Sequence, residues 1–203
     1  MINRKRNIIL FIMLIISTFS SFAITANEIL ANAANKYVNS KSISASFNIN
    51  DNGSNSGTIT TAGDKFIIST SQLSTWFDGK TQWSYSSTAN EVNISEPTAE
   101  ELQQINPFAI IGSFRNNYNA KLLDKNNGYK ISLTPKKTNP TINDIVITFN
   151  PTTYFPSLIV ITTKNNNKAT IKVKSISAGN ALPASTFTFN ATKYPGVEII
   201  DLR

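Results

Sequence analysis

Segments in which polar and apolar residues alternate recur along most of this chain, and they constrain its fold more than any other feature. In residues 43–49, Ile43, Ala45, Phe47 and Ile49 alternate with serine and asparagine. Alternation of this kind predicts a β-strand with one apolar side and one side that faces solvent. The same pattern predicts strands at residues 57–61, 65–69, 91–95, 120–124, 129–134, 144–150, 157–164, 169–177 and 186–190, in addition to a hairpin at 76–85.

The connections between these segments are short and polar, which predicts an antiparallel meander, because parallel neighbours need crossovers of about a dozen residues or more. About ten or eleven strands result, and a sheet of that size curls rather than staying flat. Helices are predicted at residues 26–37, 97–105 and 108–114. The expected fold is mainly β with an α-helical lid: an unclosed antiparallel half-barrel covered by about three short helices.

The apolar segment 108–114 follows Asn106 and Pro107, which are favourable residues for the N-cap and the first position of a helix. Two roles are open for this predicted helix. It either plugs the core of the sheet or forms a movable cover over an apolar cavity.

The hairpin at residues 76–85 contains both tryptophans of the chain. Asp78-Gly79 predicts a type I′ turn, because both central residues of that turn have positive φ and these two residue types tolerate it. Alternation places Trp76 opposite to Phe77 and puts Trp83 and Tyr85 on one face. The aromatic residues are either cross-strand core pairs or the wall of a ligand cavity.

The N-terminus predicts a secretory signal peptide over residues 1–23. Three basic residues at positions 4–6 precede an apolar run at 8–16, and Ser21-Phe22-Ala23 supplies small residues for cleavage. Cleavage is expected after Ala23, with Ala26 as the alternative site. The run is short for a transmembrane anchor, and the absence of cysteine leaves no lipidation site. We therefore expect an exported protein in which residues 24–203 form a single domain.

The residue types of the chain exclude several kinds of chemistry. The sequence has no histidine and no cysteine, so a Ser-His-Asp triad, a thiol nucleophile and the usual zinc sites are ruled out. The carboxylates are scattered over turns, which makes a calcium site or a carboxylate enzyme a poor expectation. The formal net charge is +7, but the lysines are spread without arginine-rich clusters, so no nucleic-acid partner is expected. We expect no enzyme and no metal site, and instead a module that binds an apolar ligand; a filled barrel without a cavity is the alternative.

Four segments resemble the periplasmic outer-membrane lipoprotein carrier family, the LolA family. The hairpin Asp78-Gly79-Lys80-Thr81-Gln82-Trp83-Ser84-Tyr85 is similar to an aromatic hairpin of the family, and Asn106-Pro107-Phe108 is similar to the start of its lid helix. Leu133-Thr134-Pro135-Lys136 and Phe187-Thr188-Phe189, followed by Pro195-Gly196-Val197, resemble two later segments in the same order.

The resemblance implies a half-barrel with a lid of three helices and a cavity for the acyl chains of a lipoprotein in transit to the outer membrane. It also implies loading by an ATP-driven inner-membrane exporter, release to an outer-membrane acceptor, no cofactor and a monomer. The family holds its lid with an arginine near the turn between the second and third strands, whereas this chain has Ala62-Gly63-Asp64-Lys65 there. A periplasmic lipid-binding sensor or regulator with the same half-barrel is the alternative function.

The strand pattern and the resemblance together predict the residues of the site. The expected lipid-binding wall contains Phe47, Ile49, Ile59, Trp76, Trp83, Tyr85, Ile145, Ile147, Phe149, Leu158 and Val160. The expected lid contains Leu102, Ile105, Phe108, Ile111 and Phe114. On this basis Phe47→Glu is predicted to block cargo loading in a protein that still folds. A shift of one residue in a strand would move its predicted residues to the other face of the sheet.

Overall fold

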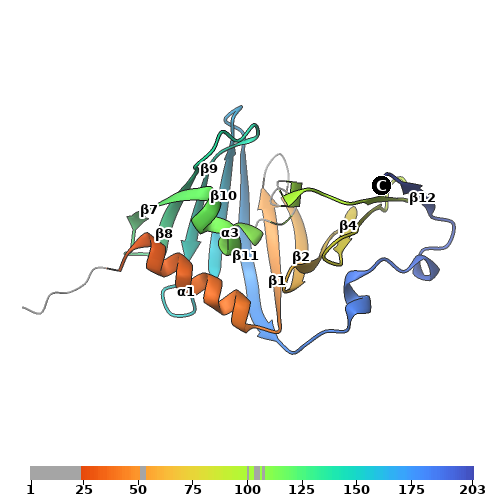
Figure 1. Ribbon diagram of the computed structural model, residues 1–203, viewed down its shortest axis with the longest axis horizontal. Coiled ribbons are helices and arrows are strands. Elements are labelled where there is room, and N and C mark those ends of the chain that lie inside the picture. The colour runs from red at the N-terminus through yellow and green to blue at the C-terminus, as the bar shows by residue number, and fades with distance from the viewer. Residues whose placement is uncertain (1–23, 51–53, 100, 103–105, 107) are drawn as a thin grey trace, which may run out of the picture.

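A single unclosed sheet forms the body of the protein. The computed structural model describes residues 24–50, 54–99, 101, 102, 106 and 108–203. Its strands follow the order β12-β6-β5-β4-β3-β2-β1-β11-β10-β9-β8-β7, with β7 and β12 as separate edges (Figure 1). The strands are β1 (Ser42–Asn50), β2 (Ser54–Ala62), β3 (Lys65–Thr70), β4 (Leu73–Phe77), β5 (Gln82–Ser86), β6 (Glu91–Ser95), β7 (Tyr118–Asp124), β8 (Tyr129–Pro135), β9 (Ile142–Phe149), β10 (Pro156–Thr163), β11 (Lys168–Gly179) and β12 (Glu198–Asp201).

The C-terminal region departs from the predicted meander. The strand expected at residues 186–190 is absent, and a 3₁₀ helix, η1 (Ala184–Phe187), occupies part of this segment, followed by η2 (Ala191–Lys193). β12 then runs parallel to β6, whereas all other paired strands of the described sheet are antiparallel. The described sheet has 12 strands, where about ten or eleven were predicted. The aromatic residues in 186–190 alternate because their side chains are buried against the sheet. The backbone of this segment does not pair with any strand of the described sheet.

Two α-helices with defined ends lie across one face of the sheet: α1 (Ala26–Asn39) and α3 (Ala109–Asn117) (Figure 1). A helical turn between β6 and α3 contains the described residues Ala99, Glu101 and Leu102. The described residues thus contain two α-helices and this turn, where about three helices were predicted. No helix in the described part of the chain is long and apolar enough to cross a membrane. The predicted signal peptide, residues 1–23, lies outside the described residues.

Identical capping boxes begin α1 and the helical turn. The Thr25 hydroxyl accepts a bond from the Glu28 N–H at 3.2 Å, while the Glu28 carboxylate accepts one from the Thr25 N–H at 2.7 Å. Thr98 and Glu101 repeat these bonds at 3.3 and 2.8 Å. Such a pair satisfies N–H groups that the first turn of a helix leaves without a partner. The bonds from the threonine backbone and hydroxyl also lower the pKa of both carboxyl groups below the ordinary value of 4.5.

Strand register decides which residues share a face. Residues directly paired across antiparallel strands point to the same side of a sheet. Ala45 pairs with Ile59, and Ile59 pairs with Ile68. Ala45 and Ile59 belong to the same buried cluster as Leu30 of α1 and Ile111 of α3. We call the side on which these residues lie the inner face, and the opposite side the outer face.

Candidate functional site: an apolar cavity beneath the lid

The inner face is hollow over the part of the sheet that contains β1 to β4. A cavity of about 630 Å³ lies there, within the size range of ligand pockets in proteins. It is enclosed by the end of α1, the first residues of β1, the β2–β3 turn, the end of β4, the β4–β5 loop, the helical turn and the start of α3. The lining residues are Tyr37, Val38, Ser40, Ile43, Thr61, Gly63, Asp64, Phe66, Phe77, Gly79, Ala99, Leu102, Asn106, Phe108, Ala109, Gly112 and Ser113.

One row of paired residues supplies the wall of the cavity. Ile43 pairs with Thr61, Thr61 with Phe66, and Phe66 with Phe77, so the four side chains cross the inner face side by side. The rings of Phe66 and Phe77 lie 5.3 Å apart, and both residues are buried. The row thus presents two aromatic rings and one aliphatic side chain to the cavity.

The roof of the cavity comes from the segment between β6 and α3. Leu102 and Phe108 line it, and both belong to the predicted lid. Asn106 is buried, and its side-chain oxygen accepts a bond from the Phe108 N–H at 3.0 Å. Asn106 therefore caps the turn that leads into α3, close to its predicted role. Ile111 and Phe114 are buried in the core instead, and Ile105 lies outside the described residues.

Glycines leave space around the cavity. Gly63, Gly79 and Gly112 all line it, and a Cβ atom placed at any of them would meet nothing within 4 Å. The β2–β3 turn, the β4–β5 loop and α3 therefore do not close upon one another at these positions.

Six predicted wall residues lie on the inner face but in packed regions. Phe47, Ile59, Ile145, Ile147 and Phe149 are buried in the core cluster, and Ile49 packs against it. None of the six lines the cavity among the described residues. The ring of Phe47 also fills the space above Gly57, where a Cβ would come within 2.6 Å of it. The prediction that Phe47→Glu leaves the fold intact is therefore replaced by the expectation that it unfolds the protein, because it would bury a carboxylate in a packed core.

Five predicted wall residues lie on the outer face, which corrects the sequence prediction. Trp76 pairs with Ile67 and with Trp83, one residue out of step with the Phe66–Phe77 row. Tyr85 is two residues from Trp83 and shares its face. In β10, Ile159 pairs with Ile147 of the inner face, so Leu158 and Val160 point outward. A shift of one residue exchanges the inward and outward faces of a strand. Because β4 and β10 have apolar side chains on both faces, the sequence did not show which face points inward.

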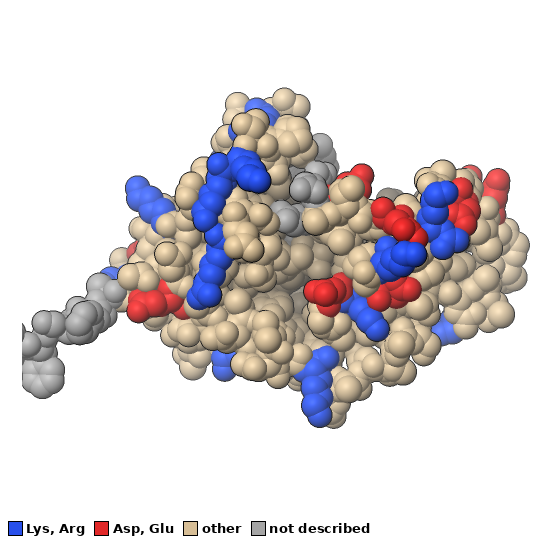
Figure 2. Space-filling model, viewed as in Figure 1, with Lys and Arg blue, Asp and Glu red and all other residues tan. Residues whose placement is uncertain are grey.

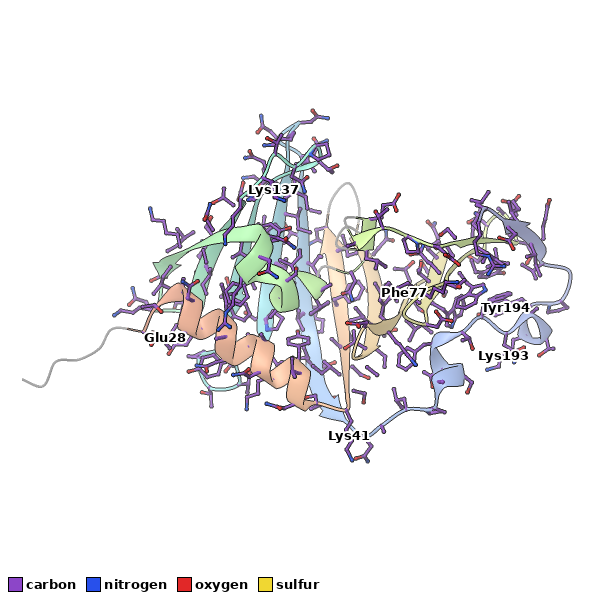
Figure 3. All side chains as sticks on the ribbon, in the orientation of Figure 1. Glu28, Lys41, Phe77, Lys137, Lys193 and Tyr194 are labelled. Carbon is purple, nitrogen blue, oxygen red and sulfur yellow. The ribbon has the colours of Figure 1, made fainter. Side chains whose placement is uncertain are left out.

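The outward aromatic residues of the hairpin form a cluster with the C-terminal segment. Trp76 lies 5.5 Å from Phe189 and 5.9 Å from Tyr194, and Tyr85 lies 4.5 Å from Tyr194, measured between ring centroids. The Tyr85 hydroxyl also donates to the Asn90 side chain, which in turn donates to the Gly196 carbonyl at 2.9 Å. Trp76 and Tyr85 therefore belong to a structural contact that holds the C-terminal segment around Tyr194, which Figure 3 labels.

The loop of the hairpin is longer than the predicted type I′ turn. Phe77 pairs with Gln82, so four residues connect the strands. Only Gly79 of the predicted pair has positive φ, at 103°. The Asp78 carboxylate instead accepts bonds from the N–H groups of Lys80 and Thr81 at 2.9 and 2.8 Å. Asp78 therefore orders the loop through its side chain.

Sequence reasoning missed the residues that line the wall of the cavity, chiefly Ile43, Phe66 and Phe77, together with Tyr37 of α1. One signal in the sequence could have indicated Phe77. Alternation places Trp76 and Phe77 on opposite faces, so only one of the two can face inward, and Phe77 was a candidate. Phe66 and Ile43 follow from Phe77 once the register is known. Tyr37 required the position of α1.

Tyr37 carries a buried hydroxyl at the boundary of the cavity. Among the described residues, nothing forms a hydrogen bond with this hydroxyl. Its ring packs edge-to-face on Phe155 at 6.1 Å. Burial raises the pKa of Tyr37 above its usual value, so the hydroxyl stays protonated and neutral.

A second, open hollow of about 770 Å³ lies near the C-terminus, lined by Gln82, Ser95, Glu96, Pro97, Glu101, Leu202 and Arg203. Its charged groups are already paired. Lys80 lies 3.1 Å from Glu96, and the Arg203 guanidinium binds Asp201 and lowers its pKa to about 2. Acidic and basic side chains stand side by side at this end of the molecule (Figure 2). The hollow therefore suits an apolar ligand less well than the cavity beneath the lid.

The family model described as "Outer membrane lipoprotein carrier protein LolA" matches residues 16–165 of the chain. The chain belongs to this family. No curated protein sequence matches it at a significant level.

Solved structures resemble this one over most of the chain. An uncharacterized conserved protein from Thermus thermophilus is similar with a TM-score of 0.59 and 13% identity, over 87% of this chain and 98% of that chain. A DUF1329 family protein from Desulfovibrio piger ATCC 29098 has a TM-score of 0.50 and 11% identity, over 83% and 99%. A LolA superfamily protein from Nitrosomonas europaea has a TM-score of 0.42 and 12% identity, over 82% and 99%.

The structure shows where this LolA-family chain departs at the lid. The β2–β3 turn lines the cavity through Gly63 and Asp64, opposite Asn106 and Gly112. Among the described residues, no hydrogen bond or ion pair joins this turn to the roof segment or to α3. The described residues of the roof therefore make no polar contact with this turn, in which residues 62–65 include no arginine.

Proposed function

We propose that this protein carries lipoproteins through the periplasm, from the inner to the outer membrane, by holding their acyl chains in the cavity beneath the lid. One observation supports the proposal above the others: the cavity lies between the roof segment and a wall of apolar side chains. The proposal includes an ATP-driven inner-membrane exporter that loads the carrier and an outer-membrane acceptor that unloads it. It includes no catalytic step and no cofactor.

The physical need for such a cavity follows from the cost of exposing acyl chains to water. Transfer of each methylene into an apolar environment gains about 0.8 kcal/mol. A lipoprotein with several acyl chains therefore does not leave a membrane unless a protein offers comparable surroundings. The aromatic pair Phe66 and Phe77, facing Leu102 and Phe108, supplies these surroundings.

The direct test is native mass spectrometry of the full chain after co-expression with an acylated lipoprotein. We expect the carrier to retain the triacylated cargo and to lose it when the cargo cysteine is replaced by serine. A free lipid in the cavity, with no lipoprotein, would instead favour the sensor or regulator. An empty protein after co-expression would contradict the proposal.

Leu102→Asp is the variant that tests the cavity itself. Leu102 is half-buried and lines the roof, so a carboxylate there would face the acyl chains in the closed protein. Because burial of a leucine side chain contributes about 1.5–3 kcal/mol, we expect cargo retention to fall about tenfold or more. Leu123→Asp is the matched control, since Leu123 is exposed on β7 and lines no part of the cavity. Equal loss in both variants would place the ligand elsewhere.

Tryptophan fluorescence offers a second readout at the wall. Both natural tryptophans lie on the outer face, so we expect an acylated ligand to leave their emission almost unchanged. In a Trp76→Phe, Trp83→Phe background, Phe77→Trp places the only tryptophan at the cavity wall. Its emission should shift to the blue when the ligand displaces water. A shift from the natural tryptophans instead would indicate binding at the outer aromatic cluster.

A further inference from the structure

We infer that the cavity opens toward a basic and apolar corner of the molecule that docks on the surface of an anionic phospholipid bilayer. The corner consists of Lys36, Val38, Lys41 and Leu182. The inference rests on the proposed function, because it assigns the surface by which the carrier meets the membrane that contains its exporter or its acceptor.

The first observation is the position of Val38. Among the large apolar side chains of the described residues, Val38 is the most exposed, at 81%. A single exposed valine is ordinary on a protein surface. Val38, however, lines the cavity together with its neighbours Tyr37 and Ser40, so it forms part of the rim. An apolar side chain that touches both solvent and the cavity provides a continuous apolar path between them.

The second observation is a second exposed apolar side chain next to this rim. The hydroxyl of Ser42, at the start of β1, donates to the carbonyl of Asn180 at 2.7 Å. Leu182 follows two residues later and is 38% exposed. The end of α1, the start of β1 and the end of β11 meet at the same lower edge in Figure 1. Leu182 therefore lies at the edge of the molecule that carries Val38.

The third observation is the charge of the corner. Lys36 and Lys41 flank Val38 in the sequence and are exposed. The chain has no acidic residue between Glu28 and Asp51, and none between Asp144 and Glu198. Lys41 projects from the lower tip of the molecule (Figures 2 and 3). The nearest acidic residue in the strand register is Asp64 of the β2–β3 turn, which lies beside the start of β1 because Ile43 pairs with Thr61.

Lysines around an exposed apolar side chain complement an anionic bilayer. The ammonium groups are attracted to the phosphates of anionic lipids, and the apolar side chains enter the interface below them. Docking at this corner would place the cavity against the bilayer. An acyl chain could then pass between a membrane-bound exporter or acceptor and the cavity without exposure to bulk water, which is unfavourable for each of its methylenes.

Vesicle flotation with the full chain tests the inference. We expect the protein to float with vesicles rich in phosphatidylglycerol at low salt, to stay behind with pure phosphatidylcholine, and to detach as the ionic strength rises. Each lysine near an anionic surface contributes about fivefold in partitioning, so Lys36→Gln with Lys41→Gln should reduce binding about thirtyfold. Val38→Asp should reduce it further at any salt concentration.

Two exposed residues away from the corner serve as controls. Lys130→Gln on β8 removes a charge, and Leu123→Asp on β7 changes an exposed leucine to the same carboxylate. Both should leave vesicle binding nearly unchanged. Equal binding to the two vesicle types, or equal losses in the corner and control variants, would overturn the inference. No binding to either vesicle type would also overturn it and would indicate a protein as the occupant of the corner.

Cargo retention, measured separately by native mass spectrometry, distinguishes this inference from the proposed function. Corner variants that retain acylated cargo but no longer bind vesicles support the inference. A protein that retains cargo and never binds vesicles contradicts the inference alone. A protein that binds vesicles but retains no cargo contradicts the proposed function, and with it the role assigned to the corner.

Discussion

The inner face has two halves, over β8 to β10 and over β3 and β4, whose strands have similar apolar sequences. They differ in whether a helix packs on them. Over β8 to β10, residues such as Ile131, Ile147 and Ile159 are fully buried beneath α1 and α3. Over β3 and β4, Phe66 and Phe77 are almost as buried, yet they line a cavity of about 630 Å³. Burial therefore does not separate a core from a binding site in this fold. The deciding factor is whether a helix fills the space above the strands.

The largest effect should come from truncating a side chain in the packed half. Phe149 is fully buried on the inner face at the end of β9. Phe149→Ala leaves a cavity in close-packed surroundings, so we expect the free energy of unfolding to fall by about 3–5 kcal/mol. Urea unfolding followed by circular dichroism measures the loss.

Phe77→Ala is the counterpart in the hollow half. Part of the Phe77 ring faces space that is already empty of protein atoms, so fewer packing contacts are lost than at Phe149. We expect a clearly smaller loss of stability and a larger loss of bound acyl probe. Equal destabilisation by the two substitutions would show that both halves are packed cores, and would break the comparison.

A smaller effect is expected at the border between the halves. Tyr37 packs on Phe155 and also lines the cavity, and its buried hydroxyl has no partner among the described residues. Because an unpaired buried hydroxyl is unfavourable, Tyr37→Phe should raise the free energy of unfolding by about 1 kcal/mol. Loss of stability in Tyr37→Phe would show that the hydroxyl has a partner in solution.

The two capping boxes allow the finest test. Thr25→Ala and Thr98→Ala each remove a hydroxyl that accepts a bond from the glutamate N–H and donates to the glutamate carboxylate, and such a cap contributes about 1 kcal/mol at a helix N-terminus. Thr25 begins α1 over the packed half, so its loss should lower global stability. Thr98 begins the roof of the hollow half, so its loss should speed release of an acyl probe and leave urea unfolding nearly unchanged. The reverse result would mean that the roof is part of the folding core.

Acidity should affect the roof through Glu101. Hydrogen bonds from Thr98 lower the pKa of Glu101, which means that they favour the ionised carboxylate. Their contribution is complete above the ordinary pKa of 4.5 and is lost as the pH falls through the lower pKa of the folded state. Acyl-probe release should therefore quicken at acidic pH in the wild type and depend less on pH in Glu101→Gln, which has no carboxyl group to protonate. An identical pH dependence in both proteins would exclude Glu101 as its cause.

Much of the architecture could be predicted from the sequence because it follows from local patterns. Period-two alternation gave the positions of β1 to β11, and apolar residues at helical spacing with acidic residues in the first turn gave α1 and the start of the roof. The half-barrel and the family resemblance agree with the observed unclosed sheet and the family match. Residues 186–190 were wrongly predicted as a strand, because their aromatic residues alternate to bury side chains on the outer face. β12 was not predicted, because it is too short to show a clear alternation of polar and apolar residues.

The sequence alone determined that this chain forms an unclosed sheet with helices on one side, since alternation and capping act within a few residues. Only the tertiary structure decided which side of each strand meets those helices, because a shift of one residue reverses a strand and leaves its pattern unchanged. It turned Trp76 toward the C-terminal segment, Trp83 toward the outer face and Phe77 toward the cavity. It also decided where the helices leave the inner face uncovered, which depends on contacts between residues far apart in the chain.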